Sequence, residues 1–197
     1  MPINHINVDY ELNYWKTVWE DKQIVTPYHR MVKTLRLKTY RHMHRVVDLG
    51  CGPLNGIFSV MDFPVMLGID PLWKEYQASF GIRNKKVIKI IGDSEKFNWV
   101  GEADLIVSVN ALDHSGDLVK SAREIRSHLR KDGIFILHMH MRTDEQLNEG
   151  HKLIFTEDTI DNAFKGIKRK WKVLYDTCPI HGGHYKTYTA CWENRKP

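Results

Sequence analysis

Cysteine is scarce in this sequence and long apolar runs are missing, and both shortages exclude classes of protein. The three cysteines, Cys51, Cys178 and Cys191, do not form an even, closely spaced set, so we expect free thiols in a reducing compartment rather than a disulfide scaffold. No stretch approaches the ~20 apolar residues of a membrane-spanning helix, and residues 1–9 lack the pattern of a signal peptide. We therefore expect a cytoplasmic protein with no membrane partner.

Low-complexity segments, linkers and internal repeats are missing as well. The 197 residues are 42% hydrophobic and 27% charged, as in folded globular proteins, and the length suits one domain over residues 1–197. The net charge is +5, and basic residues gather in 30–45 and 165–172, where they could meet nucleic acid. No aromatic residues at binding spacing accompany them, so solvated helix faces are the simpler interpretation.

Two kinds of periodicity divide the chain near residue 45. Residues 7–45 repeat apolar side chains at helical spacing, which predicts two helices, the second beginning at Pro27. Beyond residue 45 short apolar runs alternate with helical segments, one of them a helix over 118–129 that ends at the turn Asp132-Gly133. The strands predicted in this part are 45–49, 65–69, 87–91, 105–109 and 134–139.

Alternation of strands and helices predicts a mostly parallel sheet with helices on both faces, because right-handed crossovers leave few other packings. The last two strand-like segments, 171–177 and 185–192, are joined by too few residues for a helical crossover. If they pair directly, they must pair antiparallel. The predicted fold class is therefore α/β.

A glycine-rich turn, Gly50-Cys51-Gly52, follows the first predicted strand. Glycine lets the backbone approach a ligand where a Cβ would collide, and the carboxyl end of the first strand is where open α/β sheets bind nucleotides. Asp70 ends the next strand, where a carboxylate can accept hydrogen bonds from both hydroxyls of a ribose. The pair indicates a ligand that contains a ribose.

Two further observations favour an adenosyl group over a dinucleotide. A dinucleotide pattern that starts at Gly50 needs its third glycine at position 55, where this chain has Asn55. After the third strand, Gly92-Asp93-Ser94 places a carboxylate where it could accept from an adenine amino group. Each residue also has a plainer role, since the glycines could only turn the chain, Asp70 could cap the next helix and Asp93 could start a turn with Ser94.

The ordered series of these motifs resembles the class I S-adenosylmethionine-dependent methyltransferases. It consists of Asp48-x-Gly50-x-Gly52, Asp70, Gly92-Asp93, and the segments 104–110 and 129–133, and it extends from about residue 45 to the C-terminus. The resemblance implies a three-layer Rossmann-like fold whose seven-stranded sheet is mostly parallel with an antiparallel last strand. The predicted N-terminal helices match no general feature of the family, and we expect residues 1–44 to form a helical cap over a cofactor-binding core at 45–197.

The resemblance also implies S-adenosyl-L-methionine as the cofactor. Asp48 is expected near its amino group, Gly50 and Gly52 behind its methionine part, Asp70 on the ribose and Asp93 on the adenine. The sequence departs from the family at Leu54, where a glycine is common. The full set of predicted cofactor-binding residues is Asp48, Gly50, Cys51, Gly52, Asp70, Pro71, Gly92, Asp93, Ser94 and Asn110.

Asp113 and His114, just after the fourth strand, are the candidate catalytic residues. Methyl transfer needs a positioned nucleophile and, for some acceptors, a base; histidine ordinarily titrates near neutral pH, and Asp113 could orient His114 or act as the base itself. Alternatively, Asp113 caps a helix that begins near Gly116 and His114 lies at the surface. Asn110-Ala111-Leu112 differs from the acidic or Asn residue, Pro-Pro and aromatic common in enzymes that methylate base amino groups, which argues against that substrate class.

The fifth strand ends in a polar segment that could line a substrate pocket. Its His138 and His140 should face one side of the strand, because side chains alternate. Together with Arg142, Asn148 and His151 they are the predicted substrate residues, although each histidine could instead be satisfied by nearby carbonyls. We expect methyl transfer to a small polar molecule, such as a sugar or other metabolite. An RNA-directed methyltransferase and a non-catalytic cofactor-binding regulatory subunit stay open, as does the oligomeric state.

Two other patterns have plainer interpretations. Cys178-x-x-His181-x-x-His184 has residue types that bind zinc but no adjacent fourth ligand, so no metal is expected there, although the pattern leaves the question open. The aromatic series Tyr10, Tyr14, Trp15 and Trp19 could cover a substrate or pack onto the sheet, and the two roles are compatible.

Overall fold

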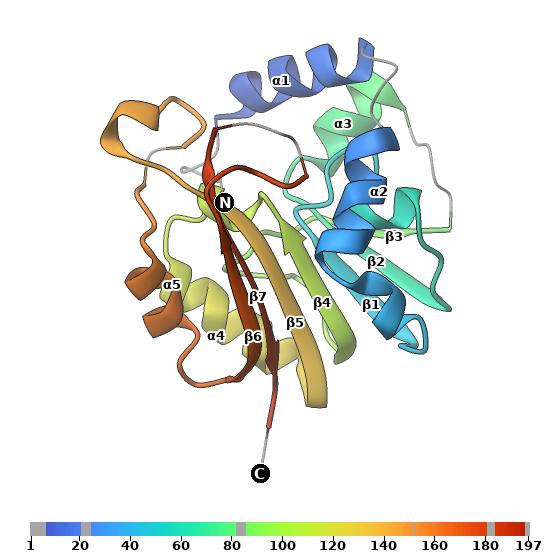
Figure 1. Ribbon diagram of the computed structural model, residues 1–197. Helices are drawn as coiled ribbons and strands as arrows, with labels where there is room; N and C mark the ends of the chain where they lie inside the picture. Colours follow the sequence, from blue (N-terminus) through green and yellow to red (C-terminus); the bar gives the residue numbers. More distant parts are fainter. Residues whose placement is uncertain (1–6, 21–24, 82–85, 152, 181–183, 196–197) are drawn as a thin grey trace.

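A computed structural model describes residues 7–20, 25–81, 86–151, 153–180 and 184–195. Within them one sheet has seven strands in the order β3-β2-β1-β4-β5-β7-β6, all parallel except β7, which runs antiparallel to both neighbours (Figure 1). The predicted fold class and the antiparallel pairing of the last two strands are confirmed. The strands are β1 (Arg45–Leu49), β2 (Val65–Ile69), β3 (Ile88–Ile90), β4 (Ala103–Val109), β5 (Leu129–Met141), β6 (Lys168–Tyr175) and β7 (Lys186–Glu193).

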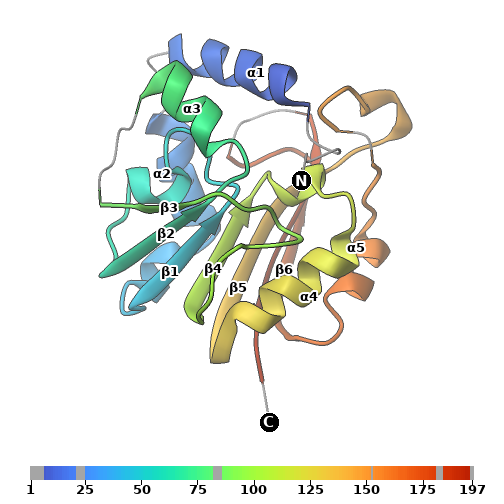
Figure 2. The same ribbon diagram turned by 180° about the vertical axis from the view of Figure 1, so that it is seen from behind.

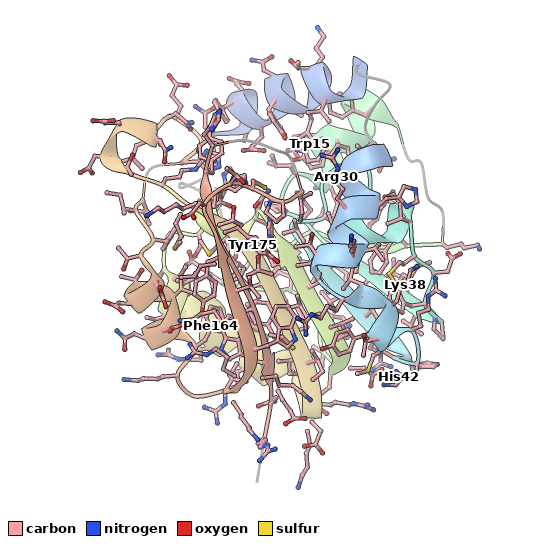
Figure 3. The ribbon with its side chains drawn as sticks, viewed as in Figure 1. Trp15, Arg30, Lys38, His42, Phe164 and Tyr175 are labelled. Carbon is pink, nitrogen blue, oxygen red and sulfur yellow. The ribbon has the colours of Figure 1, made fainter. Side chains whose placement is uncertain are left out.

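Helices cover both faces of the sheet and one of its ends. On one face lie α4 (Leu118–His128) and α5 (Glu157–Ala163), seen in front of the strands in Figure 2. The other face carries α2 (Val25–Thr34) and the short 3₁₀ turns η1 (Leu37–Tyr40) and η2 (Gly56–Ser59), with Arg30 and Lys38 on its outer side (Figure 3). At the end where the parallel strands finish, α1 (Val8–Glu20) lies beside α3 (Trp73–Phe80) (Figure 1).

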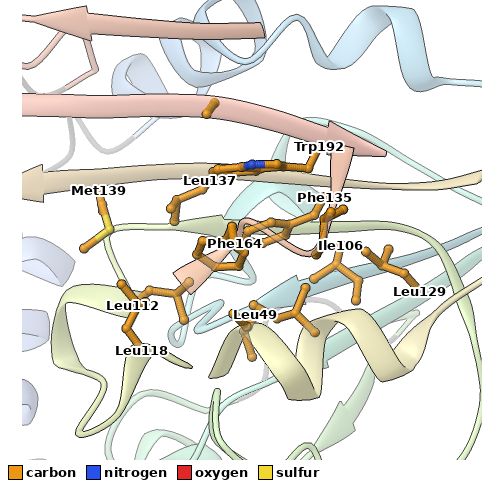
Figure 4. Packing of buried hydrophobic residues seen from close by; sticks show 14 of the residues in the cluster. Leu49, Ile106, Leu112, Leu118, Leu129, Phe135, Leu137, Met139, Phe164 and Trp192 are labelled. Carbon is orange, nitrogen blue, oxygen red and sulfur yellow. The ribbon is translucent and has the colours of Figure 1, made fainter. Parts of the chain in front are cut away.

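The alternation of side chains along β5 divides the core into two layers. Phe135, Leu137 and Met139 point toward α4 and α5, where Phe135 stacks on Trp192 with ring centroids 5.4 Å apart (Figure 4). Ile134 and Ile136 point to the opposite layer, with the buried residues of α2. His138 and His140 continue this second set, so the prediction that they face one side of the strand is confirmed.

Two helix boundaries differ from the prediction. The helix predicted over 118–129 ends at His128, and β5 begins at Leu129, so the expected stop at Asp132-Gly133 was wrong. That turn lies inside β5, where the backbone N–H of Asp132 donates to the carbonyl of Asn194 and that of Asn194 to the carbonyl of Gly133. The turn therefore pairs with the C-terminal segment. The second helix begins at Val25, with Pro27 in its first turn.

The sequence predicts no membrane-spanning helix. None of the described helices is long and apolar enough to cross a membrane. Residues 1–6, which belong to the segment without a signal-peptide pattern, and His181 lie outside the described residues.

Candidate functional site

A cavity of about 350 Å³ lies under α1 at the carboxyl ends of β1, β4 and β5. Trp15 lies on the side of α1 that faces the sheet (Figure 3). Several segments that are distant in the sequence contribute to the walls. The lining residues are Tyr10, Glu11, Tyr14, Trp15, Met31, Asp48, Gly50, Cys51, Gly56, Ile57, Val109, Asn110, Asp113, His114, His140, Arg142, Asn148, His151 and Tyr185.

The glycine turn needs glycine at both of its predicted positions. Gly50 has φ +73°, and a Cβ built on it would lie 2.1 Å from the Cβ of Ala111. Gly52 has φ +59°, and its Cβ would lie 2.5 Å from the Trp15 ring. Both the backbone conformation and the close packing therefore exclude any residue with a Cβ at these two positions. Gly50 and the buried Cys51 line the cavity beside this turn.

Asp48 places a buried carboxyl group in the cavity wall. Its Oδ2 accepts a hydrogen bond from the backbone N–H of Ile57 at 2.8 Å. A Cβ on Gly56 would lie 2.0 Å from the same oxygen, so the loop wraps closely around the carboxyl group. Burial raises the pKa of Asp48 to about 7, in spite of that hydrogen bond. A cationic group of a ligand would fit beside this carboxylate.

Asp70 connects the glycine turn to the start of α3. Its Oδ2 accepts from the N–H of Gly52 and its Oδ1 from the N–H of Leu72, both at 2.9 Å. Burial raises the pKa of Asp70 to about 6, against the effect of these two hydrogen bonds. Asp70 thus forms a turn before α3, and the N-cap of that helix, Leu72, has no side-chain capping bond. Each oxygen keeps a further acceptor site, and contact with a ribose stays a prediction.

A smaller hollow of about 40 Å³ brings together the residues predicted around the adenine. Pro71, Gly92, Asp93 and Ser94 line it, and it shares Gly50 and His114 with the larger cavity. Asp93 Oδ1 accepts from the N–H groups of Glu95 and Lys96, so the turn considered as its plainer role is formed. The adenine contact of Asp93 stays a prediction.

Asp113 lies at the polar end of the cavity and is only 3% exposed. Its Oδ2 lies 3.2 Å from Nε2 of His151 and 3.8 Å from a guanidinium nitrogen of Arg142. Burial alone would raise the pKa of Asp113, but the neighbouring His114 and His151 outweigh it and hold the pKa well below its usual range. The carboxylate therefore stays ionised. The alternative that Asp113 caps the next helix is wrong, because Asp117 does so by accepting from the N–H of Lys120.

His151 is held in one orientation by Asn148. The side-chain oxygen of Asn148 accepts from the backbone N–H groups of Gly150 and His151, each at 3.0 Å, and lies 3.1 Å from Nδ1 of His151. Nδ1 must therefore carry the proton that it shares with this oxygen. Nε2 lies between Arg142 Nη2, at 3.0 Å, and Oδ2 of Asp113, at 3.2 Å.

His114 lies in the cavity and has a carboxylate partner on α1. Nδ1 of His114 is 3.4 Å from Oε1 of Glu11, and the two side chains are 16% and 14% exposed, so the alternative of a surface position is wrong. Burial raises the pKa of Glu11, although His114 opposes this effect. Sequence reasoning missed Glu11. Its spacing of three and four residues from Tyr14 and Trp15 puts the three on one helix face, but only the fold shows what that face covers.

The structure brings four of the five predicted substrate residues to the cavity: His140, Arg142, Asn148 and His151. The fifth, His138, is fully buried and does not line the cavity. Tyr185, which sequence reasoning missed, stacks on His140 with ring centroids 4.8 Å apart and lies 4.7 Å from the Arg142 guanidinium. Tyr10, Tyr14 and Trp15 cover the cavity as the lid interpretation expects, whereas the side chain of Trp19 lies outside the described part.

Comparison with protein-family models gives no match, and neither does comparison with curated proteins. Solved structures do match. The N-methyltransferase NodS from Bradyrhizobium japonicum, in a complex with S-adenosyl-L-homocysteine, is 14% identical with a TM-score of 0.66, over 90% of each chain. An S-adenosylmethionine-dependent methyltransferase from Clostridium acetobutylicum is 13% identical with a TM-score of 0.63, over 95% of this chain and 98% of that one.

The [4+2]-cyclase SpnF also matches, at 11% identity and a TM-score of 0.63, over 84% of this chain and 81% of its own. The chain therefore has the Rossmann-like fold of the class I methyltransferases, as the resemblance implied. Because a cyclase shares this fold, the reaction has to be argued from the site.

Proposed function

We propose that the protein transfers the methyl group of S-adenosylmethionine to a small polar acceptor, such as a sugar or another metabolite. One observation supports this most strongly: a single cavity joins Asp48 and Gly50 of the glycine turn to the polar end formed by Asp113, His114 and His151. A cofactor at the first end and an acceptor at the second would meet inside the same cavity.

The residues at the first end fit the chemistry of the cofactor. The carboxylate of Asp48 suits its ammonium group, and the tight turn at Gly50 allows a close approach of its methionine part. The hollow at Pro71, Gly92 and Asp93 would receive the adenine. When bound, the cofactor supplies an activated methyl group on a sulfonium. The protein then has to orient the acceptor and remove its proton.

His114 is the base that the geometry favours, and Asp113 is a positioning residue. Asp113 is already engaged with Arg142 and His151 as an ionised group, whereas His114 faces the cavity with Glu11 behind it. In this arrangement His114 accepts the proton of an acceptor hydroxyl or amine, and Glu11 stabilises the imidazolium that results. Arg142 and Asn148 would bind other polar groups of the acceptor.

The cavity favours a small acceptor over RNA. Its volume of about 350 Å³ suits a small molecule, and Tyr10, Tyr14 and Trp15 of α1 line it. In the basic cluster at 165–172, Arg169 pairs with Asp161 at 2.6 Å and Lys170 with Glu193 at 3.2 Å. These pairs reduce the attraction of that surface for phosphate. A steep salt dependence of RNA binding would still support the RNA-directed alternative.

Direct measurements test the proposed function. Calorimetry should show binding of S-adenosylmethionine and S-adenosylhomocysteine but not of NAD⁺. A panel of sugars, amines and hydroxy acids should contain an acceptor whose addition releases S-adenosylhomocysteine. Failure of both cofactor forms to bind would overturn the proposal, and binding without turnover on any panel member would instead identify a regulatory subunit.

Cofactor affinity should depend on pH through Asp48, whose pKa is about 7. Only the ionised carboxylate pairs with the ammonium group, so affinity should fall below about pH 7, by up to about tenfold per pH unit. The stability of the protein without cofactor should depend on pH in the opposite direction. Between about pH 4 and pH 7 the folded chain keeps a proton on Asp48 that the unfolded chain has lost, so the free energy of unfolding falls as pH rises through this range.

Calorimetry in buffers of different ionisation enthalpy measures the proton release that accompanies binding at about pH 6. The matched variant is Asp48→Asn, which keeps an oxygen for the N–H of Ile57. Its affinity should be weak at every pH and should lack the pH dependence between about pH 6 and pH 8. An unchanged pH dependence in this variant would exclude Asp48 as its source.

A further inference from the structure

A second group of metal-ligating side chains lies beside the cavity. His138 and His140 extend from β5, and Cys178 follows β6 in the connection to β7. One ligand atom of each lies within 4.8 Å of those of the other two. All three residues are buried, with exposed fractions of 0%, 8% and 2%. The fold thus collects two imidazoles and one thiol in the interior.

We propose that His138, His140 and Cys178 bind one zinc ion or a similar divalent transition metal. Zinc prefers thiolate sulfur at about 2.3 Å and imidazole nitrogen at about 2.0–2.1 Å, and in a tetrahedral site these bonds place sulfur and nitrogen about 3.5 Å apart. Sγ of Cys178 lies 3.8 Å from Nε2 of His138. A shift of a few tenths of an ångström would bring the pair to ligating distance. A fourth position is left for water or another ligand.

Thr189 orients His138 for this role. Its Oγ1 lies 2.8 Å from Nδ1 of His138, and the two residues are directly paired across β5 and β7. A hydrogen bond to the outer nitrogen is the usual way in which a protein fixes a metal-binding histidine. It directs Nε2 toward Cys178. The set of two nitrogens and one sulfur favours zinc, cobalt or copper over magnesium and calcium.

The other candidate group in the cavity, Asp113, His114 and His151, is less suited to a cation. Arg142 Nη2 lies 3.0 Å from Nε2 of His151, so a positive charge already lies beside this nitrogen. The proposal therefore concerns only the group around Cys178.

Metal binding would connect β5 to the segment between β6 and β7. That segment also carries Tyr185, which packs against His140 and Arg142 in the cavity wall. The ion would thus hold one wall of the cavity in place. The sequence pattern grouped Cys178 with His181 and His184 instead, but His184 is exposed.

Cobalt(II) is a suitable probe, because thiolate ligation gives a charge-transfer band and tetrahedral geometry gives intense d–d bands. Untagged, reduced protein should take up one equivalent and show both. Cys178→Ser should lose the charge-transfer band and bind zinc at least about tenfold more weakly, and Thr189→Val should weaken binding by about 10–100-fold.

The controls are Cys191→Ser, which removes another buried thiol, one that contacts Tyr40, and His184→Ala. Both should keep the spectrum and the affinity of the parent protein. Circular dichroism and thermal melting would show whether each variant is folded, and His138→Gln gives a second disruption should Cys178→Ser unfold. Absence of stoichiometric binding, or a charge-transfer band that persists in Cys178→Ser, would overturn the proposal.

Discussion

Gly50→Ala should abolish cofactor binding and destabilise the fold. A left-handed backbone at a non-glycine residue costs about 1–2 kcal/mol, and the new Cβ would lie 2.1 Å from the Cβ of Ala111, which adds about 1–3 kcal/mol of overpacking. For a chain of this size the total corresponds to a fall in Tm on the order of 10 °C. The displaced turn would also move the N–H of Gly52 away from Asp70. Thermal melting and calorimetry with S-adenosylmethionine measure the two effects.

The matched control is Gly81→Ala. Gly81 has the same φ of +73°, with ψ −176°, and among the described residues no atom beyond its chain neighbours lies within 4 Å of a Cβ built there, so cofactor binding should survive. Ala111→Gly in the Gly50→Ala background should recover part of the lost stability, because the closest clashing atom is then removed. If Ala111→Gly recovered no stability in the Gly50→Ala background, packing against Ala111 would be shown to be unimportant.

His114→Ala should lower the turnover rate by about 10²–10⁴-fold with an acceptor identified in the panel, because general-base catalysis contributes that much. The loss should appear mainly in kcat, because a general base acts in the transfer step. Rates of S-adenosylhomocysteine release at varied acceptor concentration measure this change. His114 also lines the smaller hollow, so its loss could weaken cofactor binding as well. A separate measurement of cofactor affinity shows how much of the fall in turnover has this cause.

Two further variants separate the base from the residues that position it. Glu11→Gln keeps the size of the side chain beside His114 and removes its charge, so a smaller fall in turnover is expected. Asp113→Asn removes the charge that faces Arg142 and His151, and it should raise the KM of the acceptor more than it lowers kcat. If Asp113→Asn lowered kcat as strongly as His114→Ala and left KM unchanged, the roles of base and positioning residue would have to be exchanged.

Local sequence was sufficient to predict most strands, because a buried parallel strand leaves a short apolar run that can be read without its neighbours. The strands at 45–49 and 65–69 have the predicted bounds. The end of α4 was mispredicted for a tertiary reason. Asp132-Gly133 is a sound helix-stop signal, but Asn194 pairs with this turn and includes it in β5, and the amide of Asn194 also donates to the carbonyl of Leu129.

The site was predictable where its residues follow strand ends, and not where they come from other segments. The glycine turn, Asp70 and His114 follow predicted strands, so topology alone brings them to one edge of the sheet. Glu11 and Tyr185 approach this edge from opposite ends of the chain, and nothing in their local pattern shows that they would. His138 and Thr189 face each other only through the register of β5 and β7.

By itself, the sequence determined the order of strands and helices, the α/β class and the positions of the glycine turn and its acidic partners. These follow from backbone sterics and from the period of apolar residues, which act over a few neighbours at a time. Only the tertiary structure decided that Glu11 meets His114 and that Cys178 meets His138. Such pairs depend on how whole layers pack, because residues far apart in the chain become neighbours only when the sheet and its covering helices are assembled.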